Sequence, residues 1–318
     1  MKKIVFMIIP VLIFGLVFKS CASDKITFQA LVFLNQVVVI MEKNSINRYK
    51  IDWDDFRNEV FNTVPTAQTI DDTHPGIRKA LSLLGDNHSF FETGRGIIWG
   101  SSIPYQKEYV SVNEIPDDVG YVKVTGNFKS NETDKNFASQ IQNQIKQQDH
   151  SELKGWIVDL RNNGGGNCWP MLAGIGPILG EGIAGYFIYP DGNEQSWGYK
   201  NGASESNGHK VTRLSKSYKL LVPNPKVAVL LNSGVASSGE VIAVSFIGRE
   251  NTKSFGSPTF GLSTSNVQFK LSGNTSLHLT TAYQADRNKK IYGVPINPDM
   301  ISSQETIIND ALAWIKGQ

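Results

Sequence analysis

The stretch Gly155-Trp-Ile-Val-Asp-Leu-Arg-Asn-Asn-Gly-Gly-Gly166 begins as a short apolar run and stops abruptly at polar residues and three glycines. A second stretch has the same form: Val227-Ala-Val-Leu-Leu-Asn-Ser-Gly-Val-Ala-Ser-Ser-Gly-Glu240. Helix-like sequence follows each one, which predicts two buried strands of an α/β sheet joined by crossover helices. The glycines offer unshielded backbone N–H groups, and the second stretch offers a serine at a sharp strand-to-helix junction. Acyl transfer requires both features, an exposed nucleophile and N–H donors for the oxyanion.

The bulk composition is that of an ordinary globular protein. The chain has 318 residues, of which 40% are hydrophobic and 19% charged, enough for one large domain or two modest ones with a substantial core. A formal net charge of +2 and the lack of a basic stripe predict no nucleic-acid partner. The sequence contains neither His-Glu-x-x-His nor a cysteine cluster, so we expect no metal and no cofactor.

The N-terminus has the form of an export signal. A basic start, Lys2-Lys3, precedes the apolar or neutral run Ile4 to Phe18, which is short for a membrane-spanning helix of roughly 20 residues. Cys21 follows, so residues 1–21 are interpreted as a lipoprotein-type signal peptide with Cys21 acylated. Lys19 is unusual just before such a cysteine, and an ordinary cleaved signal or an uncleaved anchor are the alternatives. All three predict an exported protein, and the lipid or the anchor would bring it into contact with the membrane.

Two regions are predicted after the signal. Residues 24–92 carry apolar side chains at helical spacing and form an N-terminal helical region, in which Asp52 caps one helix and Pro75 opens another. Residues 119–318 form the α/β core, and the polar stretch 186–211 is interpreted as an inserted hairpin. Within the core we predict strands at 120–124, 156–160, 226–231, 267–269 and 277–281, and helices at 137–145, 171–179, 237–249 and 303–314.

Ser237 is the candidate nucleophile among three serines near the second strand end. Ser233 and Ser238 lie close by, but Ser237 stands three residues before Glu240 at the start of an apolar helix. There its side chain extends from a helix N-terminus, whose positive dipole end favours an anionic intermediate. The backbone N–H of Ser238 is then a natural donor to the oxyanion.

A serine nucleophile requires a base, and the chain contains five histidines. His88 differs from the others because it directly follows a predicted helix end, within Gly85-Asp-Asn-His-Ser-Phe-Phe91. Taken alone, His88 is either a catalytic base or a hydrogen-bonded structural residue. The remaining four lie at a helix start, in polar loops or on a strand: His74, His150, His209 and His278.

Four motifs, taken together and in this order, resemble the S41 peptidases, the tail-specific or C-terminal processing protease family. They are Asp159-Leu-Arg-Asn-Asn-Gly-Gly-Gly166, Asn232-Ser-Gly-Val-Ala-Ser-Ser-Gly-Glu240, Gly256-Ser-Pro-Thr-Phe-Gly261 and Pro298-Asp299. The resemblance spans roughly 84–299 and implies a crotonase-like α/β core with a mixed β-sheet. By motif register it also implies Ser237 as the nucleophile, and Gly165 and Ser238 as the oxyanion donors.

The sequence departs from the processing-protease branch of that family in two ways. That branch uses a serine–lysine dyad, and Leu262 stands at the lysine position here. Too few residues separate Phe91 from the strand at Gly120 for the PDZ domain usual in that branch, so we expect no PDZ domain. Both departures resemble the tricorn-like branch, in which a histidine from the N-terminal region acts as base. The resemblance therefore implies His88 as the base.

The acid that would complete the catalytic set stays open. Asp286, shortly before the Pro-Asp motif, is the nearest acidic candidate, and its alternative role is a turn cap. If the base were a lysine after all, Lys253 and Lys270 are the nearest ones.

These features predict an extracytoplasmic serine endopeptidase that acts on a peptide or protein substrate through Ser237 and His88. One alternative keeps the fold without the chemistry: a catalytically inactive binding protein for peptides or apolar ligands. The other is a different acyl-transfer enzyme such as an esterase, but the sequence has no Gly-x-Ser-x-Gly elbow. The oligomeric state and the cleavage preference do not follow from the sequence.

Overall fold

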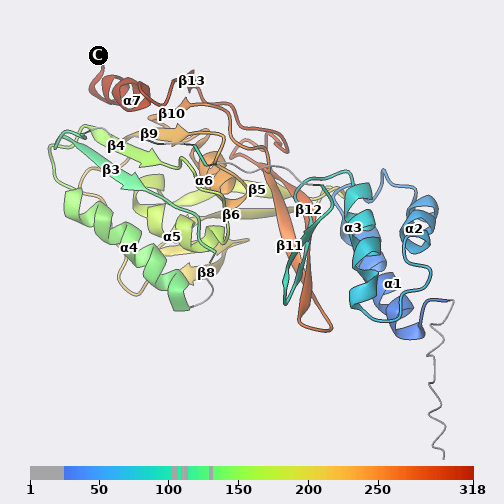
Figure 1. The fold of residues 1–318 in the computed structure, drawn as a ribbon. Helices are drawn as coiled ribbons and strands as arrows, with labels where there is room; N and C mark the ends of the chain where they lie inside the picture. Colours follow the sequence, from blue (N-terminus) through green and yellow to red (C-terminus); the bar gives the residue numbers. More distant parts are fainter. Residues whose placement is uncertain (1–24, 102–106, 109, 111–113, 129–131) are drawn as a thin grey trace, which may run out of the picture.

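The chain folds into a helical region and an α/β core, which lie side by side and meet along two long strands, β11 and β12 (Figure 1). The signal-peptide prediction falls outside the part that is described. Among the helices that are described, none is both long and apolar enough to cross a bilayer. The computed structural model describes residues 25–101, 107–108, 110, 114–128 and 132–318.

The helical region forms where the apolar spacing predicts it. Its helices are α1 (Phe28–Asn44), α2 (Trp53–Asn62) and α3 (His74–Leu83), with a short 3-10 turn at Asp71–Thr73. The Asp52 side chain accepts hydrogen bonds from the first N–H groups of α2, and Pro75 lies in the first turn of α3, as predicted. The helices bury a common apolar core that includes Leu34, Val60 and Ile77.

A short hairpin at the end of the helical region joins it to the core, and the sequence did not predict it. The hairpin consists of β1 (Phe90–Thr93) and β2 (Gly96–Trp99), and β1 also pairs antiparallel with β12 (Thr275–Ala285). Phe91, opposite Leu277, is fully buried in the core of the helical region. The segment just before β1 is therefore held against the core strands.

The α/β core contains a five-stranded sheet in which every neighbouring pair is parallel. Its order is β13-β10-β9-β4-β3. The strands are β3 (Val119–Lys123), β4 (Gly155–Asp159), β9 (Lys226–Leu231), β10 (Thr252–Gly256) and β13 (Met300–Ile301). β4 and β9 lie in the middle of the sheet, and β4 is buried along its whole length because helices cover both faces.

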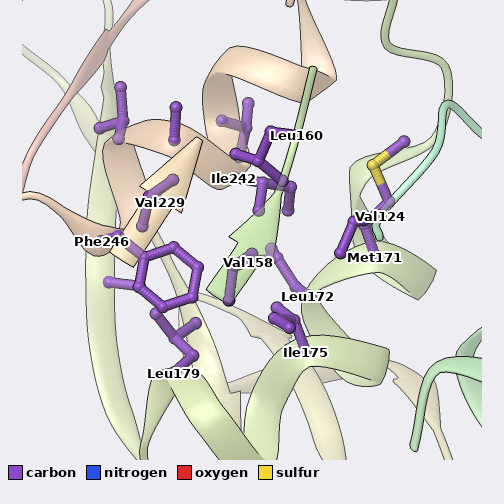
Figure 2. Packing of buried hydrophobic residues seen from close by; sticks show 14 of the residues in the cluster. Val124, Val158, Leu160, Met171, Leu172, Ile175, Leu179, Val229, Ile242 and Phe246 are labelled. Atoms are coloured by element: carbon purple, nitrogen blue, oxygen red, sulfur yellow. The ribbon is translucent and has the colours of Figure 1, made fainter. Parts of the chain in front are cut away.

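One face of this sheet packs on three helices and the other on the last helix. The helices are α4 (Glu132–Gln148), α5 (Cys168–Leu179), α6 (Ser238–Phe246) and α7 (Ile307–Lys316). Figure 2 shows the first face, where Val158 and Val229 meet Leu172, Ile175 and Phe246 of α5 and α6. On the opposite face, Ile157 and Leu230 pack against residues of α7.

A second, antiparallel sheet adds eight strands. The predicted hairpin at 186–211 is a four-stranded meander, since turns with asparagine and glycine interrupt it. β11 pairs only with β12, and the remaining order is β2-β1-β12-β5-β6-β7-β8. The strands not yet given are β5 (Gly182–Ile188), β6 (Glu194–Lys200), β7 (Ala203–Ser206), β8 (His209–Arg213) and β11 (Thr264–Leu271).

A buried ion pair fixes the carboxyl end of β4. Asp159 Oδ2 lies 2.8 Å from Arg161 Nη2, and neither side chain is exposed. Tyr121 on β3 donates its hydroxyl to the same carboxylate at 2.7 Å. Beyond this point the backbone N–H of Leu160 donates to Leu230 O at 3.1 Å, so the chain leaves β4 beside the end of β9. The loops that follow these two strands are thereby placed next to each other.

We expect Arg161→Met to lower the free energy of unfolding by about 3–5 kcal/mol, because it leaves the Asp159 carboxylate buried without its counterion. The exposed pair between Lys79 and Glu59 is the control. Glu59→Ala should change stability by less than about 1 kcal/mol. Urea unfolding of both variants measures the difference, and equal effects would contradict a structural role for the buried pair.

Candidate active site

Ser237 occupies a strained turn between β9 and α6. Its backbone has φ +53° and ψ −117°, a left-handed conformation that is costly for a residue other than glycine. Hydrogen bonds to both the N–H and the carbonyl of Ser237 hold the turn. The Ser237 N–H donates to Glu240 Oε2 at 2.9 Å, and its carbonyl accepts from Gln284 Nε2 at 3.2 Å. These contacts fix the backbone that carries the Ser237 hydroxyl.

Glu240 holds the turn at Ser237. It is fully buried, and its second carboxylate oxygen accepts from Thr259 Oγ1 at 2.6 Å and from the Gly261 N–H at 2.9 Å. Burial raises the pKa of the Glu240 carboxyl to about 7, against the lowering effect of these hydrogen bonds. The ionised carboxylate fits this arrangement, since three donors point at it.

His88 reaches Ser237 from the helical region. The distance between His88 Nε2 and Ser237 Oγ is 2.9 Å, and the imidazole is buried. Gly85, with φ +68°, ends α3, and the chain then turns so that the Asp86 carboxylate accepts from the His88 N–H at 3.0 Å. Asn266 Nδ2 on β11 donates to the His88 carbonyl at 2.8 Å. The base candidate is thus fixed by its own turn and by a core strand.

A threonine, not an acid, contacts the other nitrogen of His88. Thr264 Oγ1, at the start of β11, lies 2.7 Å from His88 Nδ1. If Nδ1 carries the proton and donates to Thr264, Nε2 is free to accept the proton of the Ser237 hydroxyl. Thr264 could not be found from the sequence beyond its closeness to the motif that ends at Gly261, because a single threonine in a strand has no distinctive pattern.

The other candidates raised by the sequence lie outside this arrangement. Asp286 accepts from the Tyr292 hydroxyl and from two backbone N–H groups of the turn after β12, so it is a turn cap. The Lys253 ammonium lies over the Phe255 ring, and Lys270 is near the far end of β11. In the described part of the chain, His88 is the side chain that is hydrogen-bonded to the Ser237 hydroxyl.

The glycine loop after β4 approaches the nucleophile closely. A Cβ atom at Gly165 would lie 2.9 Å from Ser237 Cβ and 3.1 Å from Ser238 N, and the φ of Gly165 is +103°, so a larger residue would collide there. The Gly165 N–H, expected as an oxyanion donor, instead donates to Asn163 Oδ1 at 3.1 Å. Within the described residues, the N–H groups of Ser238 and Gly166 have no hydrogen-bond partner. The Gly166 carbonyl accepts from the Ser238 hydroxyl, so both N–H groups lie on the two loops that meet at Ser237.

The sequence profile described as peptidase family S41 matches residues 118–302, more than half of the chain. The chain belongs to peptidase family S41. The expected family is thus confirmed, and the matched region contains the glycine loop and the nucleophile turn. His88 lies before it, on the helical region that the profile does not cover.

Relatives of this S41 peptidase include two kinds of named protein. It is 29% identical over 269 residues to the nisin-resistance protein of Lactococcus lactis subsp. lactis, covering 84% of this chain and 81% of that protein. It is 26% identical over 181 residues to the carboxy-terminal processing protease CtpA of Bacillus subtilis, covering 57% of this chain but only 34% of that protease. The second alignment thus spans about a third of CtpA.

Solved structures confirm the predicted S41 fold. A lipoprotein from Streptococcus agalactiae superposes with a TM-score of 0.75 at 22% identity, covering 91% of this chain and 96% of that chain. The photosystem II D1 C-terminal processing protease superposes with a TM-score of 0.59 at 15% identity, covering 91% and 97%. At these identities the likeness concerns the fold.

Burial controls the charge state of His88 in this S41 peptidase. Desolvation lowers its pKa from the ordinary 6.5 to about 4. The imidazole is then mostly neutral at pH 5 and can accept a proton there, whereas an ordinary histidine would be largely protonated.

We expect NMR titration of the folded protein to show the His88 imidazole neutral down to about pH 4, because burial disfavours the charged ring. The imidazole nitrogen shifts of ¹⁵N-labelled protein measure the charge state directly, and His88→Gln identifies the signal by its loss. A midpoint near 6.5 would show that the ring is solvated and that the buried arrangement is wrong.

Proposed function

We propose that this protein is a serine endopeptidase in which Ser237 is the nucleophile and His88 the general base. The observation that carries the proposal is the 2.9 Å contact between His88 Nε2 and Ser237 Oγ, beside two unoccupied backbone N–H donors. Membership of a peptidase family supports the reaction class. The substrate is then a peptide or a protein.

The geometry supports a two-step reaction. His88 Nε2 takes the hydroxyl proton as Ser237 Oγ attacks the peptide carbonyl, and the N–H groups of Ser238 and Gly166 hold the oxyanion. Protonated His88 then gives its proton to the leaving amine, and an acyl-enzyme remains. Water then attacks the acyl carbonyl as His88 Nε2 takes its proton, and that proton passes to Ser237 Oγ as the acid is released.

Thr264 acts as the positioning residue for the base. By accepting from Nδ1–H it fixes the ring orientation and the tautomer that leaves Nε2 free. A hydroxyl carries no charge, so it stabilises an imidazolium less than a carboxylate would. Catalysis would therefore depend mainly on the oxyanion donors and on placement, and we expect modest turnover.

Export to the cell exterior, with attachment through Cys21, is part of the proposal. The Lys-Lys start, the short apolar run and the cysteine support it, as does the likeness of fold to a protein described as a lipoprotein. The relative named for nisin resistance makes nisin the first substrate to test, and the processing protease makes unstructured C-terminal peptides the second.

A non-catalytic binding protein for peptides is the second candidate function. The missing acid beside His88 is the observation that favours it, because most Ser-His sites include one. Labelling by a fluorophosphonate distinguishes the two functions, since only an activated serine reacts. Labelling that Ser237→Ala abolishes supports the peptidase, whereas an unlabelled protein that still binds peptide supports the alternative.

Ser237→Ala should reduce hydrolysis of a cleaved peptide by several orders of magnitude, because the nucleophile is lost while the fold is kept. His88→Ala should cost about as much, and the double variant no more, since the two residues act as one unit. Turnover measured by mass spectrometry tests this, with Ser233→Ala as the control. If Ser237→Ala kept more than about a tenth of the rate, Ser237 would not be the nucleophile.

Thr264→Val should lower kcat by about tenfold to a hundredfold, because the buried Nδ1–H loses its acceptor at a cost of about 1–3 kcal/mol. KM should change little. Thr264→Ser restores a hydroxyl and should retain most of the wild-type rate. Equal loss of kcat in both variants, or an increase of KM alone, would argue against a role in orienting His88.

A further inference from the structure

The helix α1 has an unusual composition from Phe28 to Met41 for a helix at the edge of a protein. No charged residue occurs between Lys25 and Glu42, and most residues there are apolar. A surface helix ordinarily carries a polar outer face opposite its apolar inner face. The inner face of α1 follows this rule, since Phe33, Leu34 and Val37 are buried in the core of the helical region.

The outer face does not follow the rule at its amino-terminal end. Phe28, Leu31 and Val32 are 81%, 39% and 47% exposed. Their spacing of three and four residues places them on one side of the helix. We call these three side chains the amino-terminal patch. It stops within two turns, because the next exposed positions are the polar Asn35 and Gln36.

The sequence before α1 indicates what covers the patch. The apolar run Ile4 to Phe18 and Cys21 come shortly before it. Seven residues lead from Cys21 to Phe28, and even a fully extended chain of that length reaches only about 25 Å. If Cys21 is attached to lipid, the start of α1 cannot leave the neighbourhood of the bilayer. The exposed apolar side chains of the helix thus lie at the end nearest to the anchor.

We infer that the amino-terminal patch docks on the lipid surface and orients the protein on the membrane. The inference rests on the proposed lipid attachment, not on catalysis. Apolar side chains at the start of a helix can enter the boundary between headgroups and acyl chains. Figure 1 shows α1 at the opposite end of the molecule from α7. Docking through α1 would hold the helical region at the membrane and the α/β core away from it.

The test places a fluorescent reporter in the amino-terminal patch of the full-length chain. The labelled protein is purified from membranes and inserted into vesicles of phosphatidylethanolamine and phosphatidylglycerol. Val32→Cys is labelled with bimane, and nitroxide lipids labelled near the headgroup serve as the quencher. Val211→Cys on β8 is the matched control, because Val211 is 46% exposed and lies on the α/β core. The native Cys168 is buried and should stay unlabelled.

Docking predicts strong quenching at Val32 and little at Val211 while both proteins float with the vesicles. In the Val32→Cys protein, Phe28→Ser should remove most of the excess quenching, whereas Ile301→Ser, at an exposed site on β13, should not. Equal quenching at the two reporters would overturn the inference. A Val32 reporter that is shielded from water but not quenched by nitroxide lipids would also overturn it, because that result indicates a protein partner. Failure to float would overturn the attachment and the docking together, and leave the peptidase proposal untouched.

Discussion

The hydrogen bond between His88 and Ser237 joins two parts of the chain that are 149 residues apart, and most of the fold serves to make it possible. Ser237 is placed by the end of a central parallel strand, and His88 by a turn that leads into a strand of the other sheet. Gln284 on β12 links the surroundings of both residues. Its amide donates to the carbonyl of Ser237 and to the carbonyl of Thr264, whose hydroxyl contacts His88. A shift of either sheet would separate the pair.

The site is built from buried polar groups that are hydrogen-bonded to one another. The Glu240 carboxylate binds the backbone of the Ser237 turn and the 259–261 segment. His88 has a neutral partner and a pKa lowered by burial. In the proposed reaction, the charge that develops would therefore be stabilised mainly by the backbone N–H groups of the two loops, which follow strand ends.

Much of this arrangement could be predicted from local pattern. The strand at 226–231 and the meeting of two strand ends follow from apolar runs and small residues, whose effects are short-range. The cap at Asp52 and the place of Pro75 in the first turn of α3 also follow from local sequence. The strand β1 could not be predicted in this way, because four residues take their stability from β12, far along the chain. Thr264 escaped for a similar reason, since a side-chain partner 176 residues away leaves no spacing in the sequence. The contact of the Gly165 N–H with Asn163 is local, but the run of glycines does not indicate which of its N–H groups is bound within the loop.

The pairing of β1 with β12 also sets an order of events during synthesis. The segment that carries His88 leaves the ribosome before Ser237, and β12, residues 275–285, follows later still. β11, whose Asn266 binds the His88 carbonyl, also pairs with β12, so this pair of strands cannot hold His88 until β12 has been made. The two residues can therefore meet only after β12 has been synthesised, and a chain that stops before it carries both groups without an assembled site.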